Sequence, residues 1–128
     1  MKSKQVIVMR RDLNMRKGKM VAQGAHASMK AILDNMTPVT YGMTMDLQYD
    51  SPLKNWIEGI FTKICVGVDS EEELFDIFNK AQSAGLICSL ITDSGLTEFG
   101  GVPTRTCCAI GPSWDIDIDK ITGHLKLL

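Results

Sequence analysis

Residues 70–93, SEEELFDIFNKAQSAGLICSLITD, join a helix to a strand and thereby indicate the class of fold. Ser70 and Glu73 have the spacing of a capping box, which marks the N-terminus of a helix. Apolar residues follow at helical spacing, and Gly85 is the usual stop signal after a last helical turn. The run from 86 to 93 is short, apolar and partly β-branched, which is typical of a buried strand.

Helix-like and strand-like segments alternate along the rest of the chain as well. We expect further strands at 5–10, 61–68 and 105–112, and further helices at 19–36, 56–60 and 115–122. Segment 37–55 shows neither period, and a loop of that length in a compact domain is usually functional or mobile. The alternation predicts an α/β fold, a sheet with helices packed on it, formed by a single domain over 1–128.

The expected helix at 19–36 carries two stripes of different character. A broad apolar face, which we expect to pack on the sheet, consists of Val21, Ala22, Ala25, Met29, Ile32, Leu33 and Met36. A narrow polar stripe, with spacings of four, three and four residues, consists of Lys19, Gln23, His26 and Lys30. An ammonium group at a helix N-terminus suits a phosphate or a developing oxyanion. Exposed polar residues on a helix are also common without any function, so the stripe alone leaves both interpretations open.

A second polar group follows the expected strand at 86–93. Asp93 closes that strand, and Thr97 stands four residues further on in a loop. Ligands of open α/β sheets bind beyond the carboxyl ends of the strands, where a carboxylate can orient or deprotonate a water molecule. The structural alternative is an Asx turn, a frequent use of an aspartate that precedes Ser-Gly.

Charge is distributed unevenly between the two ends of the sequence. Residues 1–30 hold eight basic side chains and one acidic one, a net charge of +7, whereas the remainder of the chain carries −8. This contrast favours a basic face for a polyanion, although a solvated helix end would give the same pattern. No apolar run approaches the roughly 18 residues that a membrane span needs. The sequence therefore suggests no membrane partner.

The four cysteines and the histidines point away from metal and disulfide chemistry. No CxxC pair is present, and no histidine has zinc-ligand spacing from a cysteine. We therefore expect buried free thiols, no metal, and a cytoplasmic protein. The segment RKGKM (16–20) lacks the residues of a P-loop, and no GxSxG elbow is present, so a site that activates water suits the chain better.

Three segments together resemble the archaeal and eukaryotic-type peptidyl-tRNA hydrolases, the second peptidyl-tRNA hydrolase family. They are RRDLNMRKGKMVAQGAHA (10–27), TDSGLTEFGG (92–101) and IDKITGHLKLL (118–128), in the expected order. The resemblance implies a three-layer α/β/α sandwich with a mixed sheet of about four strands, and a homodimer. It also implies hydrolysis of the ester between a peptide and the 3′-ribose of tRNA, without metal or organic cofactor.

Position by position, the resemblance assigns roles to residues of both polar groups. The implied catalytic residues are Lys19, Gln23, His26, Asp93 and Thr97. Asp93 would orient or activate the attacking water, Thr97 would help to place it, and Lys19 would stabilise negative charge. The expected contacts with the tRNA backbone are Arg10, Arg11, Arg16, Lys17 and Lys30.

The chain departs from the family pattern in two places. Where the family typically reads Asp-x-Gly-Arg-Thr-Gln, residues 93–98 read Asp-Ser-Gly-Leu-Thr-Glu, and the 37–55 loop is longer than usual. A positive charge is lost and a negative one gained beside the expected site. Two alternatives therefore stay open: a deacylase for misacylated or D-aminoacyl-tRNA, and a non-catalytic RNA-binding or interaction module on the same fold. Retention of Lys19, Asp93 and Thr97 argues against the module.

Overall fold

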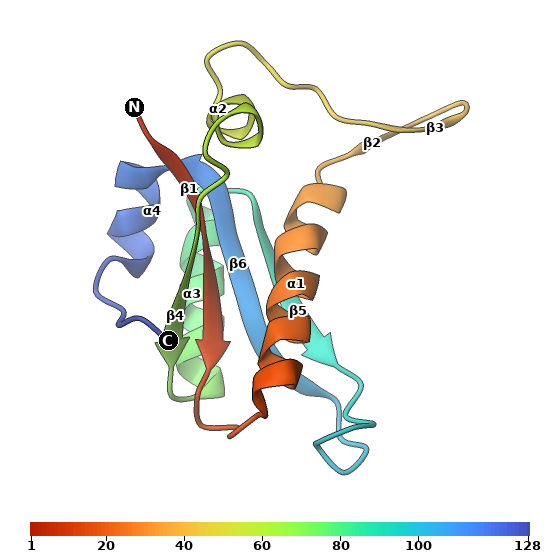
Figure 1. Ribbon diagram of the computed structural model, residues 1–128, viewed down its shortest axis with the longest axis vertical. Coiled ribbons are helices and arrows are strands. Elements are labelled where there is room, and N and C mark those ends of the chain that lie inside the picture. The colour runs from red at the N-terminus through yellow and green to blue at the C-terminus, as the bar shows by residue number, and fades with distance from the viewer.

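Strands β1 (Ser3–Arg10) and β6 (Thr104–Trp114) form the centre of a four-stranded sheet in the computed structural model, which describes residues 1–128 (Figure 1). The edge strands are β4 (Lys63–Val68), beside β1, and β5 (Cys88–Asp93), beside β6. β1 pairs with β4 in parallel and with β6 antiparallel, and β5 pairs with β6 antiparallel. The prediction of a mixed sheet of about four strands is confirmed.

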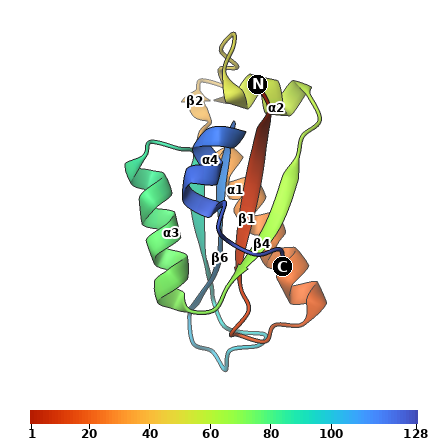
Figure 2. The ribbon, with the colours of Figure 1, turned by 90° about the vertical axis from the view of Figure 1, so that its left-hand side faces the viewer.

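Helices cover both faces of this sheet, so the molecule has three layers (Figure 2). Helix α1 (Lys17–Leu33) packs on one face, and α3 (Glu71–Ser83) and α4 (Asp115–Thr122) pack on the other. Alternate residues of β1 serve the two layers, because successive side chains of a strand point to opposite faces. Val6 and Val8 belong to the core under α3 and α4, whereas Ile7 and Met9 belong to the core under α1.

The segment that indicated the fold class forms as predicted. The Ser70 hydroxyl accepts a hydrogen bond from the Glu73 backbone N–H at 3.0 Å, which caps the N-terminus of α3. Leu74, Ile77 and Ala81 are buried against the sheet. Strands β1, β4, β5 and β6 and helices α1 and α4 agree with their predicted ranges to within about three residues, the usual scatter of helix and strand ends.

The apolar face predicted for the first helix is wrong. The residues that α1 buries are Gln23, Gly24, Ala27 and Ala31, whereas Val21 and Met29 are 73% and 59% exposed. The reason is the short distance between helix and sheet: even a Cβ at Gly24 would lie 3.7 Å from side-chain atoms of Ile7 and Met9. Only small residues fit on that line, so the larger apolar side chains lie on the outer side of the helix.

Segment 37–55 contains regular structure that the absence of periodicity did not predict. Strands β2 (Thr37–Val39) and β3 (Gly42–Thr44) form a hairpin that projects beyond the body of the molecule (Figure 1). Helix α2 (Pro52–Glu58) begins inside the same segment, where the Ser51 hydroxyl accepts from the Lys54 N–H at 3.2 Å. The loop prediction is therefore wrong for both elements, and the helical turn expected at 56–60 is the end of α2.

Candidate active site

The first turn of α1 and the end of β5 meet beside the sheet, where Lys19 and Asp93 form an ion pair. The Lys19 ammonium lies 2.9 Å from Oδ1 of Asp93 and donates a second hydrogen bond, at 2.6 Å, to the hydroxyl of Thr97. The two side chains of the ion pair are only 13% and 11% exposed. The fold thus brings an ammonium group, a carboxylate and a hydroxyl group together from distant parts of the sequence.

Gln23 supports the carboxylate from below. Its Nε2 donates to Oδ1 of Asp93 at 3.2 Å, and its Oε1 accepts from the hydroxyl of Thr106 at 2.5 Å. Because the Asp93 carboxylate only accepts hydrogen bonds, the amide nitrogen of the buried Gln23 faces Asp93, and its oxygen faces the buried Thr106 hydroxyl. The sequence analysis missed Thr106. Its only signal is a hydroxyl side chain within an apolar strand, a position that normally needs a hydrogen-bond partner.

The environment of Asp93 keeps the carboxylate ionised. The hydrogen bond from Lys19 lowers the pKa of Asp93 below its ordinary value, and the Gly95 N–H and Gln23 lower it further, against an opposing contribution from burial. The Gly95 N–H donates to Oδ2 at 2.8 Å. Since Lys19 and Gln23 both donate to Oδ1, one acceptor position on Oδ2 remains for a further donor such as a water molecule. The Asx turn and the ion pair are therefore present together.

The polar stripe predicted on the first helix divides in two. Lys19 and Gln23 belong to the cluster around Asp93, whereas His26 is exposed and makes no hydrogen bond. Lys30 is exposed and lies 3.2 Å from Asp34. Eleven residues of helix, about 16 Å, separate Lys30 from Lys19 along the axis. The structure does not bring His26 or Lys30 to the carboxylate.

The basic residues near the N-terminus also differ in their surroundings. Arg10 makes two hydrogen bonds to Asp12, at 3.1 and 2.7 Å, and the pair raises the pKa of the guanidinium. Arg11 makes two comparable bonds to Asp69, at 2.9 and 2.8 Å. In contrast, Arg16 is 89% exposed at the start of α1. Lys17, the next residue, is exposed as well.

Glu98 stands beside this helix terminus. Its carboxylate accepts from the backbone N–H of Arg16 at 3.4 Å and lies 3.8 Å from the Arg16 guanidinium. Arg16 is the N-cap residue of α1, and its own side chain makes no capping hydrogen bond. Glu98 therefore satisfies the Arg16 N–H, one of the N–H groups that every helix start leaves free. Leu96, the other departure from the family motif, is exposed in the same loop.

No three histidine, cysteine or carboxylate side chains lie together in a way that could hold a metal ion. The positive charge at the cluster comes from Lys19 and from the partial charge of the α1 N-terminus. A carboxylate that can hold water, next to a cation that can stabilise an oxyanion, is suited to hydrolysis of an acyl bond. The fold and the cluster thus define an α/β protein with a candidate hydrolytic site.

Comparison with known proteins agrees with this class. The family model of peptidyl-tRNA hydrolase PTH2 matches residues 3–128. Proteins named peptidyl-tRNA hydrolase from Methanocaldococcus jannaschii and Metallosphaera sedula are 48% and 41% identical, and each alignment covers 98% of this chain and 99% of the relative. The protein of that name from Thermococcus onnurineus is 39% identical over 98% of this chain and 97% of its own.

The chain belongs to the PTH2 family of peptidyl-tRNA hydrolases and is an enzyme of that family. The resemblance found in the sequence is therefore confirmed. The names of these relatives favour peptidyl-tRNA hydrolysis over the deacylase and the non-catalytic module.

Proposed function

We propose that this enzyme hydrolyses the ester bond between a peptide, or an N-blocked amino acid, and the 3′-ribose of tRNA, at the cluster of Lys19, Asp93 and Thr97. The observation that carries the site assignment is the ion pair of Lys19 and Asp93, which also reaches Thr97 and Gln23. Family membership supports the reaction.

In the proposed mechanism, Asp93 orients the attacking water. The free acceptor position on Oδ2 and the Thr97 hydroxyl hold the water so that its oxygen faces the ester carbonyl carbon. The lowered pKa of Asp93 makes this carboxylate a weak base, so positioning contributes more than proton abstraction in the ground state. Gln23 keeps Oδ1 engaged and thereby fixes the plane of the carboxylate.

Attack forms a tetrahedral oxyanion, and Lys19 with the first N–H groups of α1 stabilises its charge. Collapse of this intermediate breaks the bond between the acyl carbon and the ribose 3′-oxygen. The ribose oxygen leaves with one proton of the attacking water, the other proton passes to bulk solvent, and the peptide leaves as a carboxylate. Such an electrostatic contribution is typically worth about 10²- to 10³-fold in rate.

Arg16 and Lys17 are the principal tRNA contacts in this proposal. Both are exposed at the start of α1, next to Lys19, where a phosphate also meets free backbone N–H groups. Arg10, Arg11 and Lys30 contribute less because a carboxylate lies 2.7, 2.8 and 3.2 Å from their charged groups, whereas Glu98 lies 3.8 Å from the more exposed Arg16. His26 lies on the exposed side of α1 and would contact the acceptor end rather than the water. Binding through phosphates implies a strong dependence on salt.

We also propose that residues 1–128 act as one domain, in the cytoplasm, and as a homodimer. The four cysteines are free, which suits a reducing compartment. None of the helices has the length and apolar character to cross a membrane. The exposed apolar side chains Val21, Met29 and Leu33 on α1 support the homodimer, since surface groups of this kind usually mark a contact.

The direct test is release of N-acetylated amino acid from N-acetyl-aminoacyl-tRNA, with unblocked aminoacyl-tRNA as the comparison substrate. Wild type should cleave the blocked substrate, and Asp93→Asn and Lys19→Ala should lose this activity. Lys80→Ala, in an exposed pair with Asp76 on α3, is the matched control and should cleave at the wild-type rate. Equal cleavage of the unblocked substrate would favour the deacylase. Absence of cleavage by wild type, with salt-dependent tRNA binding retained, would overturn the proposal.

A further inference from the structure

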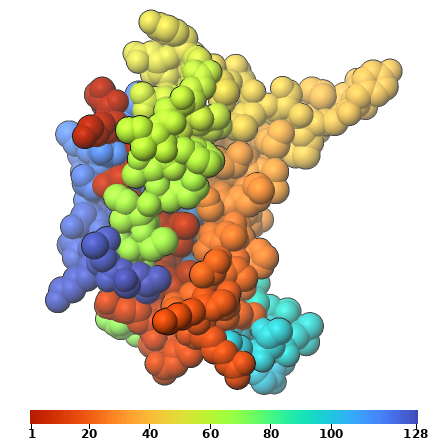
Figure 3. Space-filling model, in the orientation of Figure 1, coloured from red at the N-terminus to blue at the C-terminus, as the bar shows by residue number.

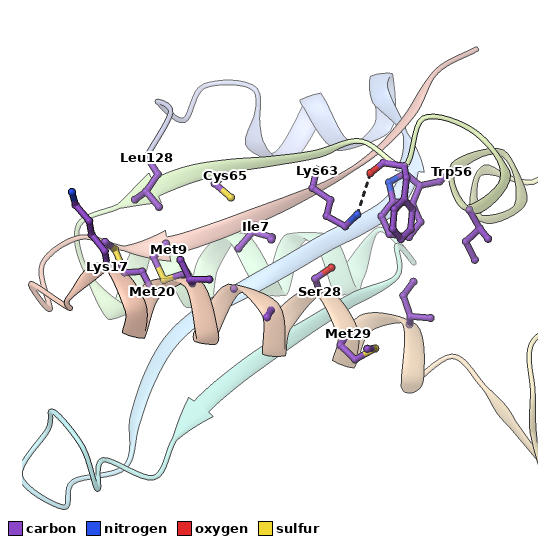
Figure 4. A pocket seen from close by; sticks show the side chains of 16 residues that line it. Ile7, Met9, Lys17, Met20, Ser28, Met29, Trp56, Lys63, Cys65 and Leu128 are labelled. Atoms are coloured by element: carbon purple, nitrogen blue, oxygen red, sulfur yellow. Dashed lines mark hydrogen bonds between the residues drawn. The ribbon is translucent and has the colours of Figure 1, made fainter.

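An apolar groove of about 900 Å³ lies on the β4 side of α1 (Figure 4). Lys19 instead faces β5, where it pairs with Asp93. Twelve of the sixteen residues that line it are hydrophobic. Its walls come from α1, α2, β1 and β4, and Met9, Met29 and Trp56 are among the lining residues. The groove exists because α1 packs mainly against β5 and β6 and α2 packs on β1 and β6, so that no helix packs along β4.

One end of the groove is a well-defined aromatic wall. The Trp56 and Phe61 rings lie 4.2 Å apart between centroids, and the Trp56 indole N–H donates to the Thr62 carbonyl at 2.7 Å. Phe61 has a φ of +64°, a conformation that a bulky residue adopts only when its surroundings hold it there. The Lys63 ammonium lies over the Phe61 ring, 3.2 Å from its centroid. These contacts keep large apolar side chains at the open edge of the sheet.

Like the groove, the projecting segment 37–50, which we call the arm, exposes apolar side chains to solvent. Val39, Tyr41 and Met43 are all exposed in it, Tyr41 at 99%. Strands β2 and β3 pack on each other and have no extended contact with any other helix or strand. A two-stranded hairpin alone is marginally stable in water, so the arm needs a surface to pack on. Figure 3 shows it extending past the C-terminal end of α1, clear of the body.

Charge identifies which surface fits the arm. Its only charged residues are Asp46 and Asp50, so it repels tRNA phosphates. The charged side chains that line the groove are those of Lys17 and Lys63, and no aspartate or glutamate lines it. An apolar, acidic arm and an apolar, basic groove are complementary. Because the hairpin of the arm projects away from the body of its own chain (Figures 1 and 3), the complementary groove is that of another copy.

We propose that the arm of one copy packs into the groove of a second copy, and that the exchange is reciprocal in a two-fold dimer. This rests on the homodimer of the proposed function and adds the segment that forms it. Because the two contacts are equivalent, the exposed Val39, Tyr41 and Met43 of both copies become buried. The aspartates of each arm then lie near Lys63 at the aromatic end of the other chain's groove.

Cross-linking between isotopically distinct copies tests the contact directly. Unlabelled and ¹⁵N-labelled protein, each with benzoylphenylalanine in place of Tyr41, are mixed, irradiated and digested. We expect cross-links to peptides of the groove in mixed-isotope pairs. The matched control carries the same group at Ile116, which is exposed on α4 on the other face of the sheet, and should give no groove cross-link. Cross-links that join only peptides of the same isotope would mean a lid within one chain and would overturn the exchange.

Sedimentation equilibrium supplies a second, independent test. Replacing residues 38–48 with a short Gly-Ser linker, or Tyr41→Ser alone, should raise the dimer dissociation constant by about tenfold or more. An unchanged constant in both variants, or a wild type that stays monomeric, would overturn the arm exchange. Hydrolysis by the wild type is measured in parallel. A dimer that depends on the arm but cleaves no peptidyl-tRNA would refute the proposed function and leave the exchange standing.

Discussion

The two flanks of α1 have opposite chemistry, although one helix supplies both. On the β5 flank, Lys19 and Gln23 reach a carboxylate through hydrogen bonds that leave little freedom. On the β4 flank, Val21 and Met29 border an open apolar groove. Gly24 and Ala27 between them let the helix lie close to the sheet. A helix held this close brings the side chains of both flanks within reach of neighbouring strands. The β5 flank supplies the candidate active site, and the β4 flank supplies the groove proposed to bind a second copy.

The largest expected effect tests the polar flank. Asp93→Asn should lower kcat/KM for N-acetyl-aminoacyl-tRNA by about 10²- to 10³-fold, because the neutral amide neither holds the water in the same way nor pairs with Lys19. Rates from single-turnover assays give this number. Dimer formation by the variant should match that of the wild type, and a variant that lost both properties would show that the two flanks are not independent.

A smaller effect is expected one layer behind the site. Thr106→Val leaves the buried Gln23 amide without its partner, which should cost about 1–3 kcal/mol in the free energy of unfolding. We expect about tenfold lower kcat as well, since the amide no longer fixes Asp93. Urea unfolding and initial rates measure the two. Thr122→Val, which loses a hydrogen bond within α4, is the matched control and should leave kcat unchanged.

The apolar flank is probed by the reactivity of its cysteine. Cys65 lines the groove and is exposed, whereas burial raises the pKa of Cys107 to about 11. Iodoacetamide at pH 8 should therefore modify Cys65 first and leave Cys107 unmodified, as followed by mass spectrometry. Raising the protein concentration should slow modification of Cys65 several-fold if an arm covers the groove. Equal rates at all concentrations would contradict that cover.

The smallest effect concerns pH. Because folding lowers the pKa of Asp93 below 3.8, its ionised form contributes stability above that pH, and the contribution is lost as the pH falls through the folded-state pKa. Urea unfolding between pH 7 and pH 2.5 should therefore show a steeper acid loss in the wild type than in Lys19→Met. Identical slopes would mean that Lys19 does not set the pKa of Asp93.

Much of the fold was predictable because helical and strand periods dominate most of the chain. The helix after Ser70 combined a cap, an apolar period and a glycine stop, and all three form. The hairpin at 37–44 was not predictable, since three-residue strands are too short to show alternation and Pro38 lies in one of them. The ranges of the long helices and strands followed from periodicity. The hairpin of the arm is defined instead by the pairing of β2 with β3, which leaves no periodic pattern in the sequence.

The site was predictable as a set of residues but not as an arrangement. An α-helix turns about 100° per residue, so Gln23 and His26 are about 60° apart around α1 although both belong to one stripe. That angle separates a buried amide from an exposed imidazole. The same geometry explains the error on the apolar face, because the small residues on the opposite side approach the sheet most closely. Pattern alone could not show which side the sheet prefers.

The backbone at Gly95 bears on which substitutions the loop after β5 can accept. Its φ of +84° is favoured by glycine, and a Cβ there would overlap the backbone of Val102. A side chain at this position would push the loop outward and carry Thr97 away from Lys19. The side chain of Leu96, its neighbour, is 83% exposed. The loop therefore tolerates a change of side chain at position 96 far better than at position 95, where the added Cβ would displace the groups that hold the catalytic hydroxyl.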